Sequence, residues 1–136
     1  MIYLTRVEEF SAAHRLHLPD QDEAGNAELF GECSNPRGHG HNYKLEVTIR
    51  GAIPPDTGML LDLKRMGEII DRVIIRQVDH KHLNFDVPFL AGKNPTAENL
   101  AVAFWNLLAD QFPGAQLHEL RIFETERSYI TYRGEA

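Results

Sequence analysis

The sequence predicts an α+β fold in which two strands precede two helices and two further strands close the chain. Three observations lead to this order. Apolar and polar residues alternate in residues 39 to 50 and near both ends of the chain, as in strands with one buried face. Two internal segments instead repeat apolar residues every three or four positions, as helices do. Turn-forming residues separate these segments. The strands and the helices thus occur in separate runs along the chain, as in α+β proteins.

The first strand is expected at about residues 2 to 14. The period of two puts Phe10, Ala12 and His14 on one face, and a change of parity near Glu8 and Glu9 suggests a bulge. Residues 17 to 30 are polar and rich in Asp, Glu, Gly and Asn, so a long excursion from the sheet is expected there.

The second strand is expected from His39 to Arg50. Its alternation places both histidines of His39-Gly-His41 on one face. The same face carries the apolar residues Tyr43, Leu45, Val47 and Ile49. Residues 51 to 58 contain two prolines and two glycines, which end the strand.

Two helices follow. The first is expected from about Asp62 to Val78, with Asp62 at its N-terminus. The second begins at Asn94-Pro95-Thr96, where we expect Asn94 to cap the helix and Pro95 to occupy the first turn. Its interior is apolar nearly all round, which suggests burial on more than one side. The last two strands are expected at about residues 117 to 125 and 128 to 133.

Composition is that of one soluble domain spanning residues 1 to 136. Hydrophobic residues make up 43% and charged residues 25% of the chain, and no apolar run of ~20 residues could span a bilayer. We find no secretory leader. A single cysteine cannot form an internal disulfide, which agrees with a reducing cytoplasmic location.

The net charge of −6 disfavours a nucleic-acid partner, because a nucleic-acid-binding face needs a basic excess. An anionic small substrate remains compatible with the sequence, since basic residues lie beside the candidate site residues and would supply a local positive field. These basic residues are Arg15, Arg37, Lys44 and Lys81.

The segment from Cys33 to Tyr43 carries the strongest chemical signal, a lone thiol followed by His39 and His41. Side chains two apart on a strand lie on one face, about 7 Å apart along the chain, so both imidazoles can reach one ion. His14 on the first strand is the best third ligand. Three imidazoles would leave an open coordination position, the catalytic arrangement of zinc. The alternatives are ordinary hydrogen-bonded histidines, or a closed structural site with Cys33 as fourth ligand.

Two further clusters suggest chemistry. Asp79 and His80 follow the first helix, and a carboxylate beside an imidazole raises its basicity for proton transfer; solvation and capping are the alternative. Glu124 shares a strand face with Leu120 and Ile122. A carboxylate on an apolar face needs a partner, such as a ligand with two adjacent N–H donors, unless Glu124 lies beyond the core on an edge strand.

Several motifs agree in order and spacing with one known family. They are Phe10-Ser-Ala-Ala-His14-Arg-Leu, Phe30-Gly-Glu-Cys33, Gly38-His-Gly-His41-Asn-Tyr, Thr57-Gly-Met59, Val78-Asp79-His80-Lys81, Asn84-Phe-Asp86-Val-Pro88, Pro95-Thr96-Ala-Glu98-Asn99 and Phe123-Glu124-Thr125. Across nearly its whole length the chain resembles the 6-pyruvoyl-tetrahydropterin synthase and 6-carboxytetrahydropterin synthase family, the pterin enzymes with the tunnelling fold.

The resemblance implies a four-stranded antiparallel sheet with two helices on one face. Three subunits would close a twelve-stranded barrel, and two trimers would stack into a homohexamer whose sites lie between subunits. It also implies a carbon–oxygen lyase that acts on 7,8-dihydroneopterin triphosphate without a redox cofactor.

Residue roles follow from the same resemblance. Zinc would be bound by His14, His39 and His41. The proton-transfer group would be Cys33, Asp79 and His80, with the thiol and the Asp-His pair supplied by different chains. Glu124 would hold the pterin ring, with Thr96 and Glu98 nearby.

Related activities remain alternatives. The queuosine-pathway enzyme, 6-carboxytetrahydropterin synthase, typically has three residues between its cysteine and His-Gly-His, whereas five separate Cys33 from His39 here, which favours the pyruvoyl branch. A folate branch cleaves the side chain with a glutamate in place of the cysteine, and Glu32 adjoins Cys33. A non-catalytic zinc-binding paralogue is a third reading, and three histidines can also hold iron or cobalt.

Overall fold

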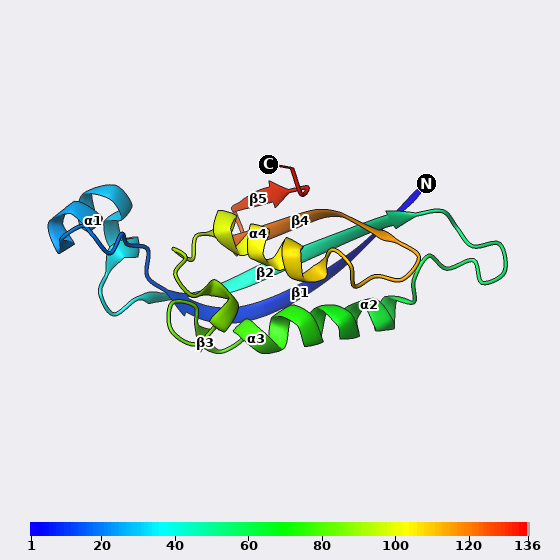
Figure 1. Cartoon of the computed structure of the whole chain (residues 1–136), viewed down its shortest axis with the longest axis horizontal. Helices are drawn as coiled ribbons and strands as arrows, with labels where there is room; N and C mark the ends of the chain where they lie inside the picture. Colours follow the sequence, from blue (N-terminus) through cyan, green and yellow to red (C-terminus); the bar gives the residue numbers. More distant parts are fainter. Residues whose placement is uncertain (136) are drawn as a thin grey trace.

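One sheet of five strands forms the middle of the molecule in a computed structural model that describes residues 1 to 135 (Figure 1). Its strands are β1 (Ile2–His14), β2 (His39–Gly51), β3 (Lys81–His82), β4 (Gln116–Thr125) and β5 (Ser128–Tyr132). Their order is β3-β1-β2-β4-β5, and only β1 and β3 are parallel. The predicted α+β class is confirmed, but the four-stranded sheet is corrected to five. The two residues of β3 are too few for alternation to reveal a strand.

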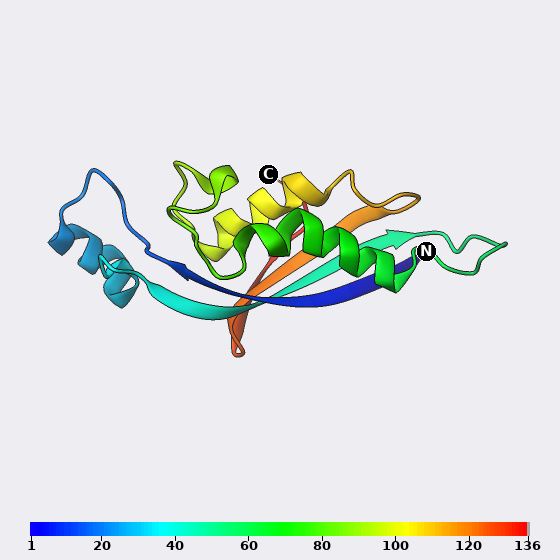
Figure 2. The ribbon, with the colours of Figure 1, turned by 90° about the horizontal axis from the view of Figure 1, so that it is seen from below.

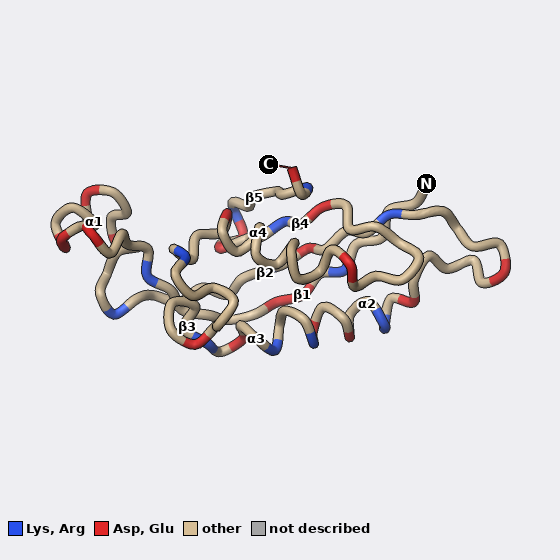
Figure 3. The backbone as a smooth tube through the Cα atoms, viewed as in Figure 1, with Lys and Arg blue, Asp and Glu red and all other residues tan. Residues whose placement is uncertain are grey.

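Two helical segments cover the same face of the sheet (Figure 2). The first joins α2 (Leu63–Ile70), a π-helical turn η2 (Asp71–Ile75) and α3 (Arg76–Val78), and the second is α4 (Ala97–Leu108). Both helices were predicted. Figure 3 shows acidic and basic residues interspersed along the solvent side of the first segment. Among the residues described, no helix is long and apolar enough to cross a membrane.

Part of the predicted excursion is helical. Helix α1 (Glu23–Phe30) and the 3₁₀ turn η1 (Gly31–Ser34) lie beyond the end of β1 and the start of β2 (Figures 1 and 2). The sequence did not reveal α1, because its residues show no helical apolar period and its one buried residue is Asn26. A further 3₁₀ turn, η3 (Pro88–Leu90), lies before α4.

The core lies between the helices and the sheet. All four apolar residues predicted for the inner face of β2 are fully buried, and they pack with residues of α2, η2, α4 and β4. The largest members of this core include Tyr43, Leu45, Ile49, Met66, Ile70, Ile74, Leu100, Phe104 and Leu120. Burying a side chain of this size contributes about 1.5–3 kcal/mol, so this layer stabilises the strand that carries His39 and His41.

The bulge predicted near Glu8 and Glu9 is wrong. Residues 2 to 14 of β1 pair with β2 in an unbroken register, so the inner face continues through polar residues. The Arg6 Nε donates to the Glu8 carboxylate at 2.9 Å, and a Cβ on Gly67 of α2 would lie 2.9 Å from the guanidinium carbon. An ion pair against a glycine therefore occupies positions where an apolar pattern would be expected.

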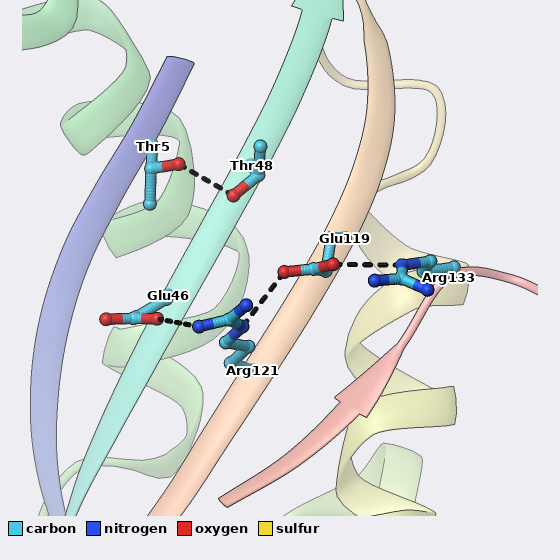
Figure 4. Close-up of polar contacts among 6 residues, drawn as sticks. All are labelled: Thr5, Glu46, Thr48, Glu119, Arg121 and Arg133. Atoms are coloured by element: carbon cyan, nitrogen blue, oxygen red, sulfur yellow. Dashed lines mark hydrogen bonds and ion pairs between the residues drawn. The ribbon is translucent and has the colours of Figure 1, made fainter. Parts of the chain in front are cut away.

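The opposite face of the sheet carries a group of polar contacts (Figure 4). A ladder of side chains crosses three strands and the end of the chain after β5: Thr5, Thr48, Glu46, Arg121, Glu119 and Arg133. Within it, the Glu119 carboxylate accepts from Arg121 and from Arg133, each at 2.9 Å. Helices therefore cover only one side of the sheet.

Helix α4 begins after Thr96, not after Asn94 as predicted. The Thr96 Oγ1 accepts a hydrogen bond from the Asn99 backbone N–H at 3.1 Å. The Asn94 side chain is turned elsewhere, since its Oδ1 accepts from the His17 N–H at 3.1 Å. Both residues are good caps, and the long-range partner of Asn94 decides between them.

We expect Thr96→Ala to lower the free energy of unfolding by ~0.5–2 kcal/mol, the usual cost of losing an N-cap. Thr96→Ser keeps the hydroxyl and is the matched control, so it should retain nearly all of the stability. Denaturant unfolding of both variants measures the difference. Equal stability of Thr96→Ala and the parent chain would show that this hydroxyl does not cap α4.

Candidate functional site

Three histidines converge where β1 ends and β2 begins. The register of the β1–β2 ladder puts His14 directly opposite His39, and His41 lies two residues further along β2. One ligand atom from each of the three side chains lies within 4.8 Å of the others. The His14 Nε2 and the His39 Nε2 are 3.1 Å apart. The structure therefore brings together the three residues that the sequence analysis selected as metal ligands.

A backbone carbonyl fixes the orientation of His14. The His14 side chain is fully buried, and its Nδ1 lies 2.8 Å from the carbonyl oxygen of Pro95. Because a carbonyl only accepts, Nδ1 carries the proton and Nε2 keeps its lone pair. The Tyr43 hydroxyl is 3.2 Å from the same Nδ1. The nitrogen that faces the other histidines is therefore the one able to bind a metal.

The electrostatics of the group also fit a metal ion. Burial lowers the pKa of His14 to about 4, assisted by the neighbouring imidazoles, although the bond to Pro95 acts in the opposite direction. Burial lowers the pKa of His41 as well, and His39 adds to this shift. A histidine binds a metal only as a neutral imidazole. The lowered pKa values favour the neutral forms of His14 and His41 at physiological pH.

An unpartnered nitrogen and the spacing of two others support the same conclusion. Within residues 1 to 135, the His41 Nε2 is buried and has no hydrogen-bond partner. Buried polar atoms without partners are costly. The 3.1 Å between the Nε2 atoms of His14 and His39 is close to the ~3.3 Å expected for two nitrogens about 2.0–2.1 Å from one tetrahedral ion. The residues present therefore fit a metal held by three imidazoles.

Cys33 lies near this group without joining it. It is half-buried in η1, and its carbonyl accepts from the Leu16 N–H at 2.8 Å. The converging donor atoms found among the described residues come from the three histidines alone. Burial raises the pKa of Tyr43, and the charges of Glu124 and Cys33 raise it further. The hydroxyl beside His14 thus lies within electrostatic reach of both predicted functional groups.

The Asp79-His80 pair is held against β1. The Ser11 N–H donates to the Asp79 Oδ1 at 2.9 Å, and the His80 N–H donates to the Ser11 carbonyl at 2.6 Å. The pKa of Asp79 is lowered, chiefly because of the Ser11 N–H and also because of His80. The Asp79 Oδ1 is 3.1 Å from the His80 Nδ1. This contact leaves the His80 Nε2 free to exchange a proton.

His80 has two further properties that bear on function. Its φ of 60° is the one positive value outside glycine among the described residues, a conformation that costs free energy in most side-chain-bearing residues. Its side chain is 83% exposed. Within residues 1 to 135, no hydrogen bond joins the Asp79-His80 pair to Cys33.

Glu124 lies at a break in the sheet. Strands β2 and β4 stay paired only as far as Lys44 and Phe123, and the β4–β5 register shifts between Phe123 and Thr125. Glu124 is therefore the extra residue of a bulge, a device that often redirects a side chain near a site. Alternation alone predicted its face, but it gave no sign of this bulge.

Two hollows meet at Glu124. One of about 660 Å³ is also lined by Tyr43 and Asp79. The other, of about 280 Å³, is lined by Thr96 and Glu98 as well. Burial raises the pKa of Glu124, and the charge of Glu98 raises it further. The three residues predicted to bind substrate thus border one hollow, although they come from α4, its cap and β4.

Two contributors to the site were missed by the sequence analysis. Tyr43 was assigned only to the core, although its hydroxyl reaches His14, and Pro95 was assigned only to a helix start, although its carbonyl fixes the tautomer. A tyrosine at the inner end of the histidine face was a usable signal, because a buried hydroxyl requires a partner. No sequence pattern reveals a backbone carbonyl that acts over this distance.

We expect Glu124→Gln to stabilise the free protein at neutral pH. A carboxyl whose pKa is raised on folding destabilises the native state once it ionises, so stability falls as pH rises above the ordinary value of 4.5. The gain from Gln should shrink toward zero as the pH falls below 4.5, where the carboxyl is protonated in both states. Thermal unfolding of parent and variant across this range measures the difference.

Glu126→Gln is the matched control, because Glu126 is an exposed carboxylate two residues away. It should change the unfolding midpoint little. A destabilised Glu124→Gln protein at neutral pH would contradict the account of Glu124 as an unpaired, half-buried carboxylate.

Comparison with known proteins agrees with this geometry. Residues 3 to 135 match the family described as 6-pyruvoyl tetrahydropterin synthase. A Poecilia reticulata protein named 6-pyruvoyl tetrahydrobiopterin synthase is 48% identical over 133 residues, which cover 98% of this chain and 90% of that protein. A Drosophila melanogaster protein of the same name is 47% identical, with coverages of 97% and 79%.

A solved structure gives the same result in three dimensions. The Caenorhabditis elegans 6-pyruvoyl tetrahydropterin synthase aligns with a TM-score of 0.89 and 37% sequence identity, covering 98% of this chain and 96% of that one. The agreement in sequence and in fold extends over nearly the whole chain, and the chain therefore belongs to the 6-pyruvoyl tetrahydropterin synthase family.

Proposed function

We propose that this protein is a zinc-dependent 6-pyruvoyl-tetrahydropterin synthase that eliminates triphosphate from 7,8-dihydroneopterin triphosphate. The observation that carries the proposal is the three-histidine group in a chain that also holds an uncoordinated thiol and a half-buried carboxylate bordering two hollows. Relatives that cover 97% or more of the chain bear the names of such enzymes. The reaction is that of a carbon–oxygen lyase, with oxidation level transferred inside the substrate.

Glu124 would hold the pterin ring. Its carboxylate borders both hollows, and an ionised carboxylate can accept two parallel N–H bonds from a guanidine-like edge. The raised pKa of Glu124 supports this role, because a buried carboxylate without a donor gains most from a ligand that supplies one. Glu98 and Thr96 lie beside the same hollow and would complete the recognition of the ring.

His14, His39 and His41 would hold zinc and leave one coordination position open. Bound there, zinc would supply Lewis acidity to the side-chain hydroxyls of the substrate. The chain's own contribution is orientation, since Pro95 keeps the His14 lone pair directed at the group. The low pKa of His14 would keep this ligand neutral and available.

Cys33 would remove a proton from the substrate side chain. A thiol has an ordinary pKa of about 8.5 and acts as thiolate, so it must give up its own proton first. His80 suits that exchange: Asp79 contacts its Nδ1, so Nε2 is left to accept a proton. Proton loss from carbon then breaks the bond to the triphosphate oxygen, and tautomerisation carries the electron pair into the ring.

We also propose that the active form is a homohexamer of two stacked trimers. Two observations support a site shared between chains. His80 is 83% exposed, and within residues 1 to 135 no hydrogen bond connects it to Cys33. A neighbouring subunit that brought its Cys33 to this His80 would complete the proton-transfer group. The face of the sheet that carries the contacts of Figure 4 would then line the barrel.

The function is tested by incubating the purified protein with dihydroneopterin triphosphate and identifying the product by mass. We expect the 6-pyruvoyl product and released triphosphate. Cys33→Ala should lower turnover at least about a hundredfold, the contribution typical of a general base, while the pterin still binds. A carboxylated pterin would instead assign the queuosine-pathway activity. Side-chain cleavage that persists in Cys33→Ala and is lost in Glu32→Ala would assign the folate branch.

The metal is tested separately. We expect the protein to purify with about one zinc per subunit and His41→Ala to lose most of it, because two imidazoles hold zinc poorly. Cys33→Ala should keep its zinc. Elemental analysis by mass spectrometry measures both variants. Full zinc in His41→Ala would remove that residue from the site, and metal loss in Cys33→Ala would support a closed site with a thiolate ligand.

A further inference from the structure

The four residues that follow β1 continue as an extended segment without a neighbouring strand. Side-chain amides take the place of strand partners for three of them. Asn84 bonds to the backbone of Arg15, Asn94 to His17, and Asn26 to Leu18. The remaining residue, Leu16, donates its N–H to a backbone carbonyl in η1. The segment therefore depends on asparagines for its conformation.

Asn84 holds Arg15 by both of its backbone groups. The Arg15 N–H donates to the Asn84 Oδ1 at 2.8 Å, and the Asn84 Nδ2 donates to the Arg15 carbonyl at 2.9 Å. An amide with one donor and one acceptor used in this way mimics a paired strand residue. Arg15 follows the predicted metal ligand His14 directly, so this clamp fixes the first residue beyond the metal group.

The clamped segment in turn holds the turn that carries Cys33. The Leu16 N–H donates to the Cys33 carbonyl at 2.8 Å, and the Arg15 Nε donates to the Ser34 carbonyl, also at 2.8 Å. These two bonds hold two consecutive peptide groups, the one that follows Cys33 and the one that follows Ser34. The position of Cys33 relative to His14 is therefore set by Arg15 and Leu16.

Asn84 is itself fixed to β1. The neighbouring Leu83 N–H donates to the Ala13 carbonyl at 2.7 Å, and the Asn84 N–H lies 3.3 Å from the His82 Nδ1. Asn84 also closes the loop that begins with Asp79 and His80. One loop therefore presents an acid–base pair at its start and supports the thiol-bearing turn of the same chain at its end.

We propose that Asn84 is a positioning residue, which acts through Arg15 and Leu16 to hold Cys33 at a fixed distance from the three-histidine group. The inference rests on the proposed function of Cys33 as the base. Asn84 bonds to Arg15 and not to the thiol, and it is neither one of the three histidine ligands nor a lining residue of the hollows at Glu124. Its removal should therefore affect the proton-transfer step and not metal or pterin binding.

The test uses Asn84→Ala in the full-length protein, with Asn106→Ala as control for an exposed asparagine of α4. Cys33 is the single cysteine of the chain, so its alkylation by iodoacetamide reports on this turn alone. Well above the ordinary thiol pKa of about 8.5 the rate reports access. We expect alkylation of Asn84→Ala to be on the order of tenfold faster than that of the parent, as expected for losing two hydrogen bonds.

Three further readouts separate positioning from a general structural role. Zinc content should be unchanged, amide exchange at Leu16 should accelerate, and kcat should fall about tenfold or more while KM stays within about twofold. Asn84→Asp keeps the oxygen that accepts from the Arg15 N–H, so it should recover part of the loss.

Parent-like alkylation and exchange in Asn84→Ala would overturn the proposal, as would a parallel loss of zinc and fold. Alkylation and exchange do not require turnover, so a failed assignment of function would be recognised independently.

Discussion

The hydrogen-bonded pairing of β1 with β2 is the constraint on which the site depends. Thirteen successive residue pairs run without interruption from Ile2 opposite Gly51 to His14 opposite His39. A slip of one residue would turn every side chain of one strand to the other face, and the histidines would then lie on opposite sides of the sheet. The apolar side chains of β2 that face the helices are buried, and a slip would expose them. The core therefore fixes the register, and the register brings the three histidines together.

The two hollows at Glu124 lie where β4 stops following β2. Pairing stops at Lys44 and Phe123, and the bulge at Glu124 leaves a carboxylate at the break. Two carboxylates, Glu98 and Glu124, border one hollow, and the negative charge of Glu98 adds to the burial that disfavours ionisation of Glu124. A ligand that brings N–H donors would relieve that repulsion. Glu124, the carboxylate that destabilises the free chain when ionised, is therefore the residue that we propose to bind the pterin.

Much of the fold could be predicted because its signals are local. Alternation located four of the five strands, and helical periodicity located both long helices. The errors have physical causes that the sequence hides. Arg6 and Glu8 lie on the inner face of β1, where apolar residues were expected, and they pair with each other there. Asn94 does not cap α4, because its side chain accepts a hydrogen bond from His17. Helix α1 carries no apolar stripe because it packs outside the core.

The candidate site was likewise predictable only where its signals are local. Residue type and spacing selected the three histidines. Imidazole is a common metal ligand, and the alternation of side chains along a strand shows which histidines share a face. The carbonyl of Pro95, the hydroxyl of Tyr43 and the amide of Asn84 were not readable. Each acts across more than 25 positions of the chain, so only the folded backbone brings them to His14 and Arg15.

The central claim is that three imidazoles hold zinc while Cys33 stays uncoordinated and free to act as a base. X-ray absorption at the zinc edge of the loaded protein tests this claim most directly, because nitrogen and sulfur ligands differ in distance. The account predicts nitrogen or oxygen neighbours alone, at about 2.0–2.1 Å, with the outer-shell scattering of three imidazoles. A sulfur neighbour at about 2.3 Å would place Cys33 on the metal and contradict the account.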